Sequence, residues 1–473
     1  MDLRNYLLMK QEISLLVVFL ILIIYDLFAT EKSKKYFQPI ACILFLANII
    51  YGFFPQGMGT SFSGMYVSGA VEIAIKNILN IGVFLVFLQS DGWLSKSGAS
   101  FKRGEFFMIT LLTLFGMYLM ISSGHFLLFY IGLETASLPM ASLVAFEKYK
   151  NNSAEAGAKY IFTAVFSSAI LLFGISLLYG AMGTLYFDDI TLFMSSTPLL
   201  VLAMIFFVVG LFFKISLVPF HFWTADVYQG APTNVTAYLS TISKGAAVFA
   251  LMTILYRTFT MLAVEWHTIL WWVTAISITV GNLFAIRQKN LKRFLAFSSI
   301  SQAGYIILSV ISGTPQGMAS TIYFILVYIF SNMAAFGVIA AIENKSSKVD
   351  MDDYNGLYKT NPLLAVIMMI ALFSLGGIPP TAGFFSKFFV FIAAADQGEY
   401  LLVLIALVNT IISLYYYLLI VKAMFITPND NPIEKFKSDN YMRISMVICL
   451  AGLVVLGFTS GIYEYLNINS FGK

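Results

Sequence analysis

Residues 213–223, with the sequence FKISLVPFHFW, place a proline and a lysine late in an otherwise apolar stretch. Residues 376–380, with the sequence GGIPP, interrupt a second apolar stretch, and Lys387 follows that interruption. Proline removes a backbone donor and clashes with the preceding helical turn, so both stretches predict broken helices. Irregular backbone at membrane depth is tolerated only beside protein or water. We therefore expect both breaks to lie inside the protein, each close to a lysine.

The composition around these breaks is that of an integral membrane protein. Of the 473 residues, 59% are hydrophobic and only 11% are charged, whereas soluble domains carry about 25% charged residues. The chain contains about fourteen apolar stretches, each long enough for the roughly 20-residue helix that crosses a bilayer. The sequence thus predicts an all-α integral membrane protein with about fourteen transmembrane helices, of which the seventh and twelfth are broken. The loops are short, so we expect no soluble catalytic domain.

The positions of the basic residues predict the orientation of the chain. Most of the 28 Lys and Arg lie in loops that follow odd-numbered apolar stretches. The positive-inside rule places these loops in the cytoplasm. With an even number of spans, both termini should lie on the outer, periplasmic side of a bacterial-type inner membrane. The first apolar stretch has no evident cleavage site, so we interpret it as a true span.

The spacing of the two breaks suggests a duplication, because five spans separate them. A second copy of a five-helix unit enters the membrane from the opposite side, which gives the inverted repeat common in transporters. The predicted parts are residues 1–104 with helices 1–3, residues 105–257 with helices 4–8 as the first repeat, residues 258–425 with helices 9–13 as the inverted second repeat, and residues 426–473 with helix 14.

Ionisable residues within the apolar stretches are the candidate functional residues. Each costs about 2.5–3.5 kcal/mol on insertion scales, so such groups rarely persist without a partner or a task. Glu134 lies in an apolar helix, and we expect a lysine partner for it. A lysine that loses its counter-charge in such a site can pass a proton onward. The candidate proton carriers are Glu134, Lys214, Lys244 and Lys387.

Three further residues are possible relay residues, and each has a structural alternative. Lys159 is also explained as an anchor at the cytoplasmic side. His221, within the first break, is also explained as a hydrogen-bonded structural histidine. Lys292 lies where topology alone accounts for a positive charge.

Glu72 and Lys76 are four residues apart on the third predicted span. At this spacing they share one helix face, so we expect them to pair with each other and to be structural. Cys42 and Cys449 lie in separate apolar stretches without metal-ligand spacing and are interpreted as packing residues.

The motifs around the breaks resemble a known family. FKISLVPFHFW at 213–223, followed by DVYQGAPT at 226–233, is similar to the signature of the antiporter-like membrane subunits of respiratory complex I, and the second motif is typical of the subunit N branch. NLKR at 290–293, SSISQAGY at 298–305 and GIPP at 377–380 extend the resemblance. It covers helices 4–13 and, by helix count, the flanking helices.

This resemblance implies a proton-translocating subunit of an NADH:quinone oxidoreductase, with the proton route at Glu134, Lys214, Lys244 and Lys387. It implies no redox chemistry and no cofactor in this chain, since flavin, iron–sulfur clusters and quinone belong to partner subunits. It also implies that the partners are other complex I membrane subunits, especially a neighbouring antiporter-like subunit and small membrane subunits, together with the lipid bilayer, and that nucleic acid is not bound.

Two alternatives stay open from the sequence. An Mrp-type cation/proton antiporter subunit would need carboxylate or carbonyl ligands for sodium near the breaks. A purely structural scaffold would hold the buried charges as static pairs, and removing both members of a pair would then leave function intact.

Overall fold

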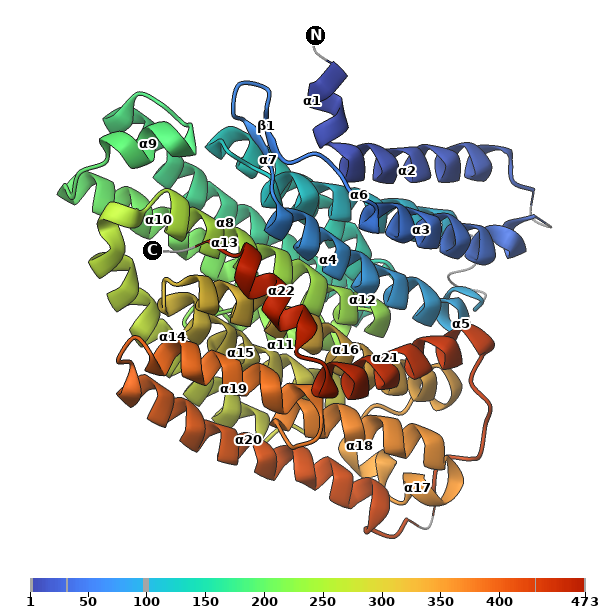
Figure 1. The fold of residues 1–473 in the computed structure, drawn as a ribbon. Helices are drawn as coiled ribbons and strands as arrows, with labels where there is room; N and C mark the ends of the chain where they lie inside the picture. The colour runs from blue at the N-terminus through green and yellow to red at the C-terminus, as the bar shows by residue number, and fades with distance from the viewer. Residues whose placement is uncertain (1–2, 31–32, 97–101, 430, 472–473) are drawn as a thin grey trace.

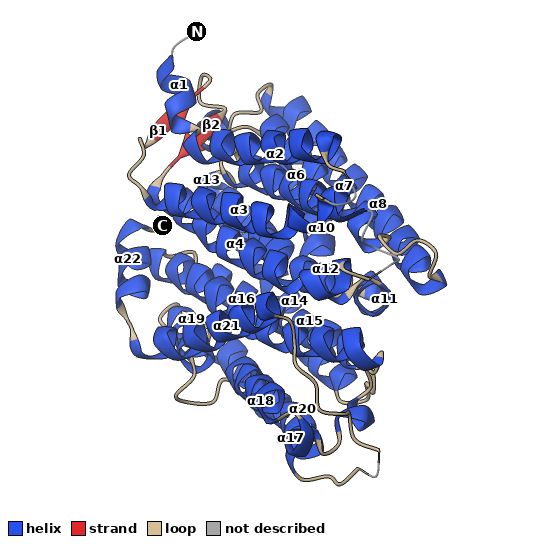
Figure 2. Ribbon diagram, turned by 90° about the vertical axis from the view of Figure 1, so that its right-hand side faces the viewer, coloured by secondary structure: helices blue, strands red, loops and turns tan. Residues whose placement is uncertain are grey.

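The chain folds into a bundle of long helices that lie side by side, with one short β-hairpin near the N-terminus (Figures 1 and 2). The structure is a computed structural model that describes residues 3–30, 33–96, 102–429 and 431–471. The predicted all-α membrane fold is confirmed for these residues. The hairpin pairs β1 (Gly59–Ser61) antiparallel with β2 (Tyr66–Ser68) and was not predicted.

The helices follow one another in three groups. The N-terminal group is α1 (Leu3–Leu8), α2 (Lys10–Phe28), α3 (Phe37–Phe53), α4 (Ala70–Gln89) and α5 (Asp91–Leu94). The first central group is α6 (Arg103–Ile121), α7 (Phe126–Val144), α8 (Asn151–Met182), α9 (Phe187–Phe193), α10 (Pro198–Ile215), α11 (Phe222–Gly230), α12 (Thr233–Tyr238) and α13 (Lys244–Arg257). The remainder is α14 (Ala263–Ala285), α15 (Leu291–Ile311), α16 (Pro315–Ser346), α17 (Leu357–Thr360), α18 (Pro362–Gly376), α19 (Ala382–Ala395), α20 (Tyr400–Phe425), α21 (Asn440–Phe458) and α22 (Gly461–Asn469).

Thirteen helices within the described residues are long and apolar enough to cross a membrane. Two shorter apolar helices, α18 and α19, occupy the stretch predicted as the twelfth span, so its role as a further crossing stays a prediction. The apolar windows of three candidate spans are entirely buried, namely Thr233–Arg257, Leu291–Ile311 and Pro315–Ser346. The centre of the bundle is therefore α12–α13, α15 and α16, and the other helices surround it.

Both predicted helix breaks are confirmed. The first separates the end of α10 at Ile215 from the start of α11 at Phe222, and the second separates the end of α18 at Gly376 from the start of α19 at Ala382. Each first half-helix ends in a residue with left-handed backbone, Ser216 (φ 65°) and Gly377 (φ 83°).

The two breaks also share their closing hydrogen bonds. In both, the residue after the left-handed residue donates its N–H to the carbonyl five positions earlier, which is the Schellman arrangement. The donor and acceptor pairs are Leu217 with Phe212 and Ile378 with Phe373. This shared geometry agrees with the predicted duplication, while the inverted relation of the two halves stays a prediction.

Close glycine contacts recur between the first two helices of each predicted repeat. A Cβ on Gly116 of α6 would lie 2.7 Å from the Gly132 carbonyl oxygen of α7, so the two backbones approach within contact. A Cβ on Gly281 of α14 would lie 2.6 Å from the Ser301 amide nitrogen of α15. Any larger residue would push either pair apart. Glu134 thus lies on a helix whose backbone is fixed against its neighbour.

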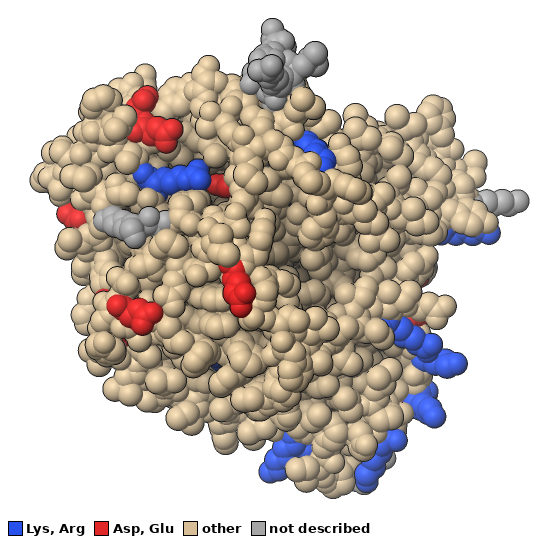
Figure 3. Space-filling model, in the orientation of Figure 1, with Lys and Arg blue, Asp and Glu red and all other residues tan. Residues whose placement is uncertain are grey.

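Charged side chains divide between two ends of the bundle. In Figure 3, Lys and Arg gather along the right and lower edge, whereas exposed Asp and Glu lie mainly on the left. We call the first end the basic face; its exposed basic residues include Lys35, Lys148, Lys150, Arg287, Lys289, Lys345 and Lys359. We call the opposite end, which carries β1, β2 and α9, the hairpin face. The terminal residues themselves lie outside the described ranges.

Candidate proton path

Glu134 lies in the middle of α7 and is partly buried. Its Oε1 has no hydrogen-bond partner among the described residues. Tyr130, one turn earlier on the same helix, interacts with the carboxylate. A buried carboxylate oxygen without a donor is costly, so it is poised to accept a proton or a water.

Lys214 occupies the last turn of α10, directly before the first break, and is partly buried. Its charge interacts with that of Glu134, so it is the lysine expected near this carboxylate. The two side chains do not form a direct ion pair, however, within the part of the chain that the structure describes. The centroid of the Tyr160 ring is 5.9 Å from Lys214 Nζ. The charges of Lys214 and Glu134 therefore interact without a direct contact between the two side chains.

Two tyrosines lie between Lys214 and Lys244. The hydroxyl groups of Tyr160 and Tyr228 are both buried and have no partner among the described residues. The Trp223 ring lies between them, 5.5 Å from Tyr160 and 6.2 Å from Tyr228 between centroids. Buried polar atoms without protein partners are the usual sites of internal water. This segment can thus hold the water that a proton needs to move between the two lysines.

Lys244 is only 3% exposed and begins α13 directly after a π-helical turn, Leu239–Ser243. Its Nζ donates to Ser299 Oγ at 2.8 Å, and the Tyr228 ring centroid lies 5.5 Å away. π-Helical turns occur frequently at functional sites, because they change the register of a helix without breaking it. Sequence reasoning missed this turn, since no proline or glycine marks it.

Lys387 lies in α19, after the second break, and is 4% exposed. Its Nζ donates to the Gly376 carbonyl at 3.3 Å and lies 4.6 Å from the Tyr305 ring centroid. The carbonyl that it binds belongs to the last residue of α18. The break therefore supplies the oxygen that holds this lysine, and the lysine lies close to the break as the sequence predicted.

Side chains of α15 connect Lys244 with Lys387. Gln302, one turn after Ser299, donates to the Leu375 carbonyl at 3.0 Å and to the Tyr417 hydroxyl at 3.2 Å. Leu375 precedes Gly376, whose carbonyl binds Lys387. Sequence reasoning did not assign a role to these groups, although the polar run SSISQ at 298–302 within an apolar helix was a signal for them.

The three possible relay residues lie apart from this line. Lys159 is 40% exposed and forms ion pairs with Glu155 at 2.7 Å and Asp226 at 2.6 Å, while Arg293 contacts Asp226 at 2.6 Å. These contacts support the anchor interpretation of Lys159. His221 is buried in the first break and stacks on Phe222, and its Nδ1 has no partner among the described residues.

Lys292, the third possible relay residue, is buried at the start of α15 rather than exposed on the basic face. Its Nζ donates to the Ala231 carbonyl at 3.0 Å and lies 3.5 Å from Glu343. Both residues line a cavity of about 190 Å³, which Glu147 and Lys150 of the basic face also line. Lys292 is thus positioned between this face and the buried core, which favours an inlet role.

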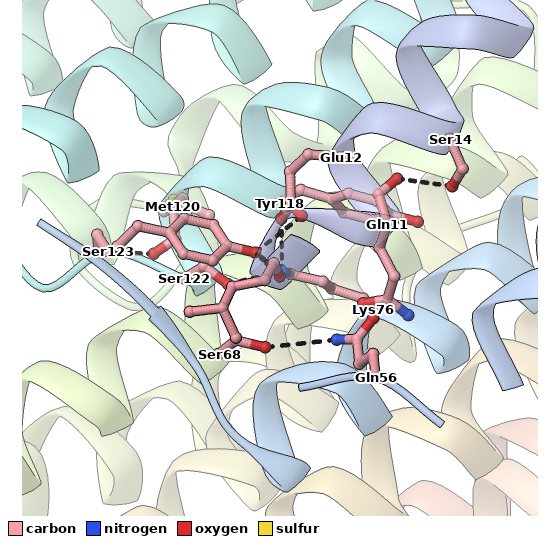
Figure 4. Close-up of polar contacts among 12 residues, drawn as sticks. Gln11, Glu12, Ser14, Gln56, Ser68, Lys76, Tyr118, Met120, Ser122 and Ser123 are labelled. Carbon is pink, nitrogen blue, oxygen red and sulfur yellow. Dashed lines mark hydrogen bonds and ion pairs between the residues drawn. The ribbon is translucent and has the colours of Figure 1, made fainter. Parts of the chain in front are cut away.

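The expected pairing of Glu72 with Lys76 is wrong. Lys76 pairs with Glu12 of α2, and Nζ and Oε1 are 2.5 Å apart (Figure 4). Glu72 pairs with Arg257 of α13 at 3.0 Å. The two residues do lie on the same helix, but each pairs with a residue of a neighbouring helix, because a charge on that helix is better placed than the residue one turn away.

Cys42 and Cys449 are buried free thiols, as expected for packing residues.

The fold, the two broken helices and the line of buried lysines define an antiporter-like membrane subunit. Residues 123–413 match the family described as NADH:quinone oxidoreductase/Mrp antiporter, transmembrane region, and this range includes Glu134, Lys214, Lys244 and Lys387. The chain belongs to this family.

Among its relatives, NADH-quinone oxidoreductase subunit N of Phocaeicola vulgatus is 58% identical over 468 residues, which are 99% of each chain. A chain in the structure of respiratory complex I from Thermus thermophilus with bound aureothin is 31% identical, with a TM-score of 0.78 over 95% of this chain and 97% of that one. A chain of the Mrp complex from Dietzia sp. DQ12-45-1b has a TM-score of 0.84 at 21% identity, over 99% and 96% of the two chains, and shows the shared fold alone.

Proposed function

We propose that this chain is the proton-translocating, antiporter-like membrane subunit of an NADH-quinone oxidoreductase. The observation that carries the proposal is the line of polar groups from Glu134 through Lys214 and Lys244 to Lys387, which lies within a predominantly apolar bundle. The 58% identity to a subunit N over nearly the whole of both chains supports the same function.

Protons would move along this line by changes in charge pairing. While Glu134 is ionised, its negative charge attracts the ammonium group of Lys214. When that charge is neutralised or moved away, burial favours the neutral amine, and Lys214 releases its proton toward the tyrosine segment and Lys244. Lys244 can pass a proton to Lys387 by way of Ser299, Gln302 and internal water. The Lys292 cavity would supply protons from the basic face.

The energy for these steps would come from quinone reduction in other subunits. Flavin, iron–sulfur clusters and quinone would belong to those partners, and a neighbouring antiporter-like subunit together with small membrane subunits would flank this chain. Within the described residues, no group of three or more His, Cys, Asp or Glu side chains is placed to hold a metal ion. We also propose that the basic face is cytoplasmic and that both termini lie on the periplasmic side of a bacterial-type inner membrane.

The Mrp-type antiporter is the alternative function. The shared fold alone cannot separate the two, because both kinds of complex contain it. Sequence identity distinguishes the two functions better. This chain is 58% identical to the subunit N of Phocaeicola vulgatus but 21% identical to the Mrp chain of known structure. The buried cationic side chains along the path also suit protons, which lysines bind directly, better than sodium, which needs oxygen ligands.

The test is proton pumping by membrane vesicles in which Lys214→Met or Lys244→Met replaces the native lysine. Methionine keeps the volume and removes the titratable group. We expect NADH-driven pumping to fall about tenfold or more, since positioned proton-transfer groups contribute at least this much. Lys422→Met, which removes an exposed lysine from α20, is the matched control and should pump normally.

Assembly of the complex must be measured alongside, for example by the amount of intact complex on a native gel. Normal pumping by both assembled variants would contradict the proposal and leave the static-scaffold interpretation. Pumping that requires sodium in the native complex, and disappears in sodium-free buffer, would instead favour the antiporter alternative.

A further inference from the structure

A second set of buried charges lies outside the proton path, between α2, α4, α6 and β2 (Figure 4). Lys76 and Glu12 are each 1% exposed, and Nζ and Oε1 are 2.5 Å apart. Lys76 also donates to Ser122 Oγ at 2.6 Å, and the Tyr66 hydroxyl donates to Glu12 Oε2 at 2.8 Å. Both charged groups of this cluster, Lys76 and Glu12, are hydrogen-bonded.

The cluster lies just beneath the hairpin face. Glu12 is two residues after Lys10, the first residue of α2, which is a rise of about 3 Å along the helix. Lys10 donates to the Phe54 carbonyl at 2.9 Å, and residues 57–60 of the adjoining loop are exposed. Tyr66 belongs to the hairpin itself. One side of the cluster is therefore close to the water that bathes this face.

Its other side is connected with the interior of the bundle. Asn80 lies one turn after Lys76 on α4, and the Tyr118 hydroxyl donates to its Oδ1 at 2.5 Å. The Tyr118 ring centroid is 5.5 Å from Lys76 Nζ. Farther along α6, the Thr113 hydroxyl lies 2.6 Å from the hydroxyl of Tyr238 in α12.

Tyr238 is connected in turn with the proton path. Tyr238 interacts electrostatically with Tyr118 and, separately, with Tyr160. The Tyr160 hydroxyl is buried without a partner, and its ring lies 5.9 Å from Lys214. Hydroxyl groups and an amide thus form a succession of polar groups from Lys214 to Lys76, with gaps that internal water can fill.

We propose that Glu12 and Lys76 form a proton-release site that connects Lys214 with the hairpin face. This inference rests on the proposed function. Lys76 passes a proton from Nζ to Glu12 Oε1, which leaves a neutral amine and a neutral carboxylic acid. The acid then releases the proton to water at the hairpin face, and the carboxylate is restored. The amine takes up the next proton from the hydroxyl chain, so one proton enters and one leaves in each cycle.

A fixed ion pair is a weak explanation for this cluster. Two buried charges lose hydration that their attraction repays only in part, and apolar residues of similar volume often pack as well or better. Ionisable groups within membrane spans are rare and commonly mark ion pathways and proton relays. The cluster also lies where a release site is needed, between the buried lysines and an aqueous face.

The experiment is a double substitution, Glu12→Gln with Lys76→Met, in the assembled complex. Removing both charges together avoids the uncompensated charge that either single substitution would leave, so the complex should assemble. We expect NADH-driven proton pumping to fall about tenfold, because water can replace only part of what a positioned proton-transfer group contributes. The matched control is Glu72→Gln with Arg257→Met, which removes the other ion pair of α4 and should leave pumping unchanged.

The outcomes separate this inference from the proposed function. If Lys214→Met abolishes pumping while the Glu12/Lys76 double variant assembles and pumps normally, the pair only stabilises helix packing. The proposal of a release site is then wrong. If Lys214→Met and Lys244→Met both pump normally, the proposed function fails instead. An equal loss in both double variants would also overturn the release site, since it would show a general effect of charge removal on α4. Should the Glu12/Lys76 double variant fail to assemble, Lys76→Arg decides: it keeps the ion pair but cannot give up its proton, so normal pumping by assembled Lys76→Arg would overturn the proposal.

Discussion

The two broken helices close in the same way but hold their lysines differently. At the first break, Lys214 precedes the left-handed residue Ser216, is partly exposed, and is coupled to Glu134 without contact. At the second, Lys387 follows the left-handed residue Gly377, is 4% exposed, and donates to a carbonyl of the break itself. One lysine has room and a neighbouring carboxylate, whereas the other is enclosed by backbone.

This difference assigns different tasks to the two breaks. A lysine that faces a carboxylate across a gap responds to any change in that carboxylate's charge, because the interaction is not saturated by a direct bond. A lysine held by a neutral carbonyl has no such counter-charge, so its proton is controlled by burial and by its neighbours in the path. Lys214 at the first break is thus suited to respond to a change in the charge of Glu134. Lys387 at the second break is suited to pass the proton on.

Lys387→Arg should have the largest effect, because it disrupts both packing and function. A Cβ on Gly377 would lie only 3.1 Å from Lys387 Cδ, so a bulkier guanidinium has no space beside this backbone. Overpacking a buried site costs about 1–3 kcal/mol, and losses of this size lower protein abundance severalfold. We expect less assembled complex on native gels and no pumping by the remainder.

Lys422→Arg, on the exposed side of α20, controls for the loss at Lys387. A normal amount of pumping complex with Lys387→Arg would show that the second break is not enclosed as described, and the contrast between the breaks would disappear.

Lys214→Arg should leave assembly normal and abolish function. This side chain is partly exposed and has space, and arginine keeps the positive charge that Glu134 senses. Arginine does not deprotonate in proteins, so it cannot release the proton that lysine releases. We expect pumping per assembled complex to fall about a hundredfold, the scale of a lost acid–base group. If Lys214→Arg pumps like the native complex, this residue acts as a fixed charge and not as a proton carrier.

The sequence predicted the features that are local along the chain. Both breaks follow from proline and glycine next to apolar runs, and they fall within the residues predicted. The burial of Lys244 and Lys387 and the partial burial of Lys214 follow from their depth in apolar spans. These features depend only on neighbouring residues, so one sequence suffices to find them.

The features that depend on how helices meet were not predictable. Lys76 finds Glu12, which is 64 residues away, and Glu72 finds Arg257, which is 185 residues away. An i, i+4 spacing shows only that two residues can meet, while the rotation and depth of the neighbouring helices decide whether they do. The link through Gln302 also depends on α15 lying against the end of α18, which no local pattern reports.

Gly377→Ala tests the second break at its backbone. The left-handed conformation costs a non-glycine residue about 1–2 kcal/mol, and the new Cβ would press on the Lys387 side chain. We expect the purified complex to lose activity severalfold faster on heating, with pumping reduced in the same sample. Gly398→Ala is a suitable control, because Gly398 also has positive φ but nothing lies within 4 Å of its Cβ position. Equal losses in both variants would show that backbone strain alone is responsible and that contact with Lys387 adds nothing.

Ser216→Gly should have the smallest effect and the opposite sign. Ser216 has φ 65°, which glycine adopts without steric cost, and its buried hydroxyl has no partner among the described residues. Glycine would relieve the strain and remove the unpaired hydroxyl, whereas its greater freedom in the unfolded chain offsets part of this gain. We expect a net stabilisation of about 0.5–1 kcal/mol, seen as slower thermal inactivation with unchanged pumping. Ser216→Ala removes the hydroxyl but keeps the strained Cβ, so it should gain less. If Ser216→Gly instead lowers pumping in a stable complex, the Ser216 hydroxyl takes part in proton transfer beside Lys214. The first break then contributes this hydroxyl to the proton path in addition to its lysine.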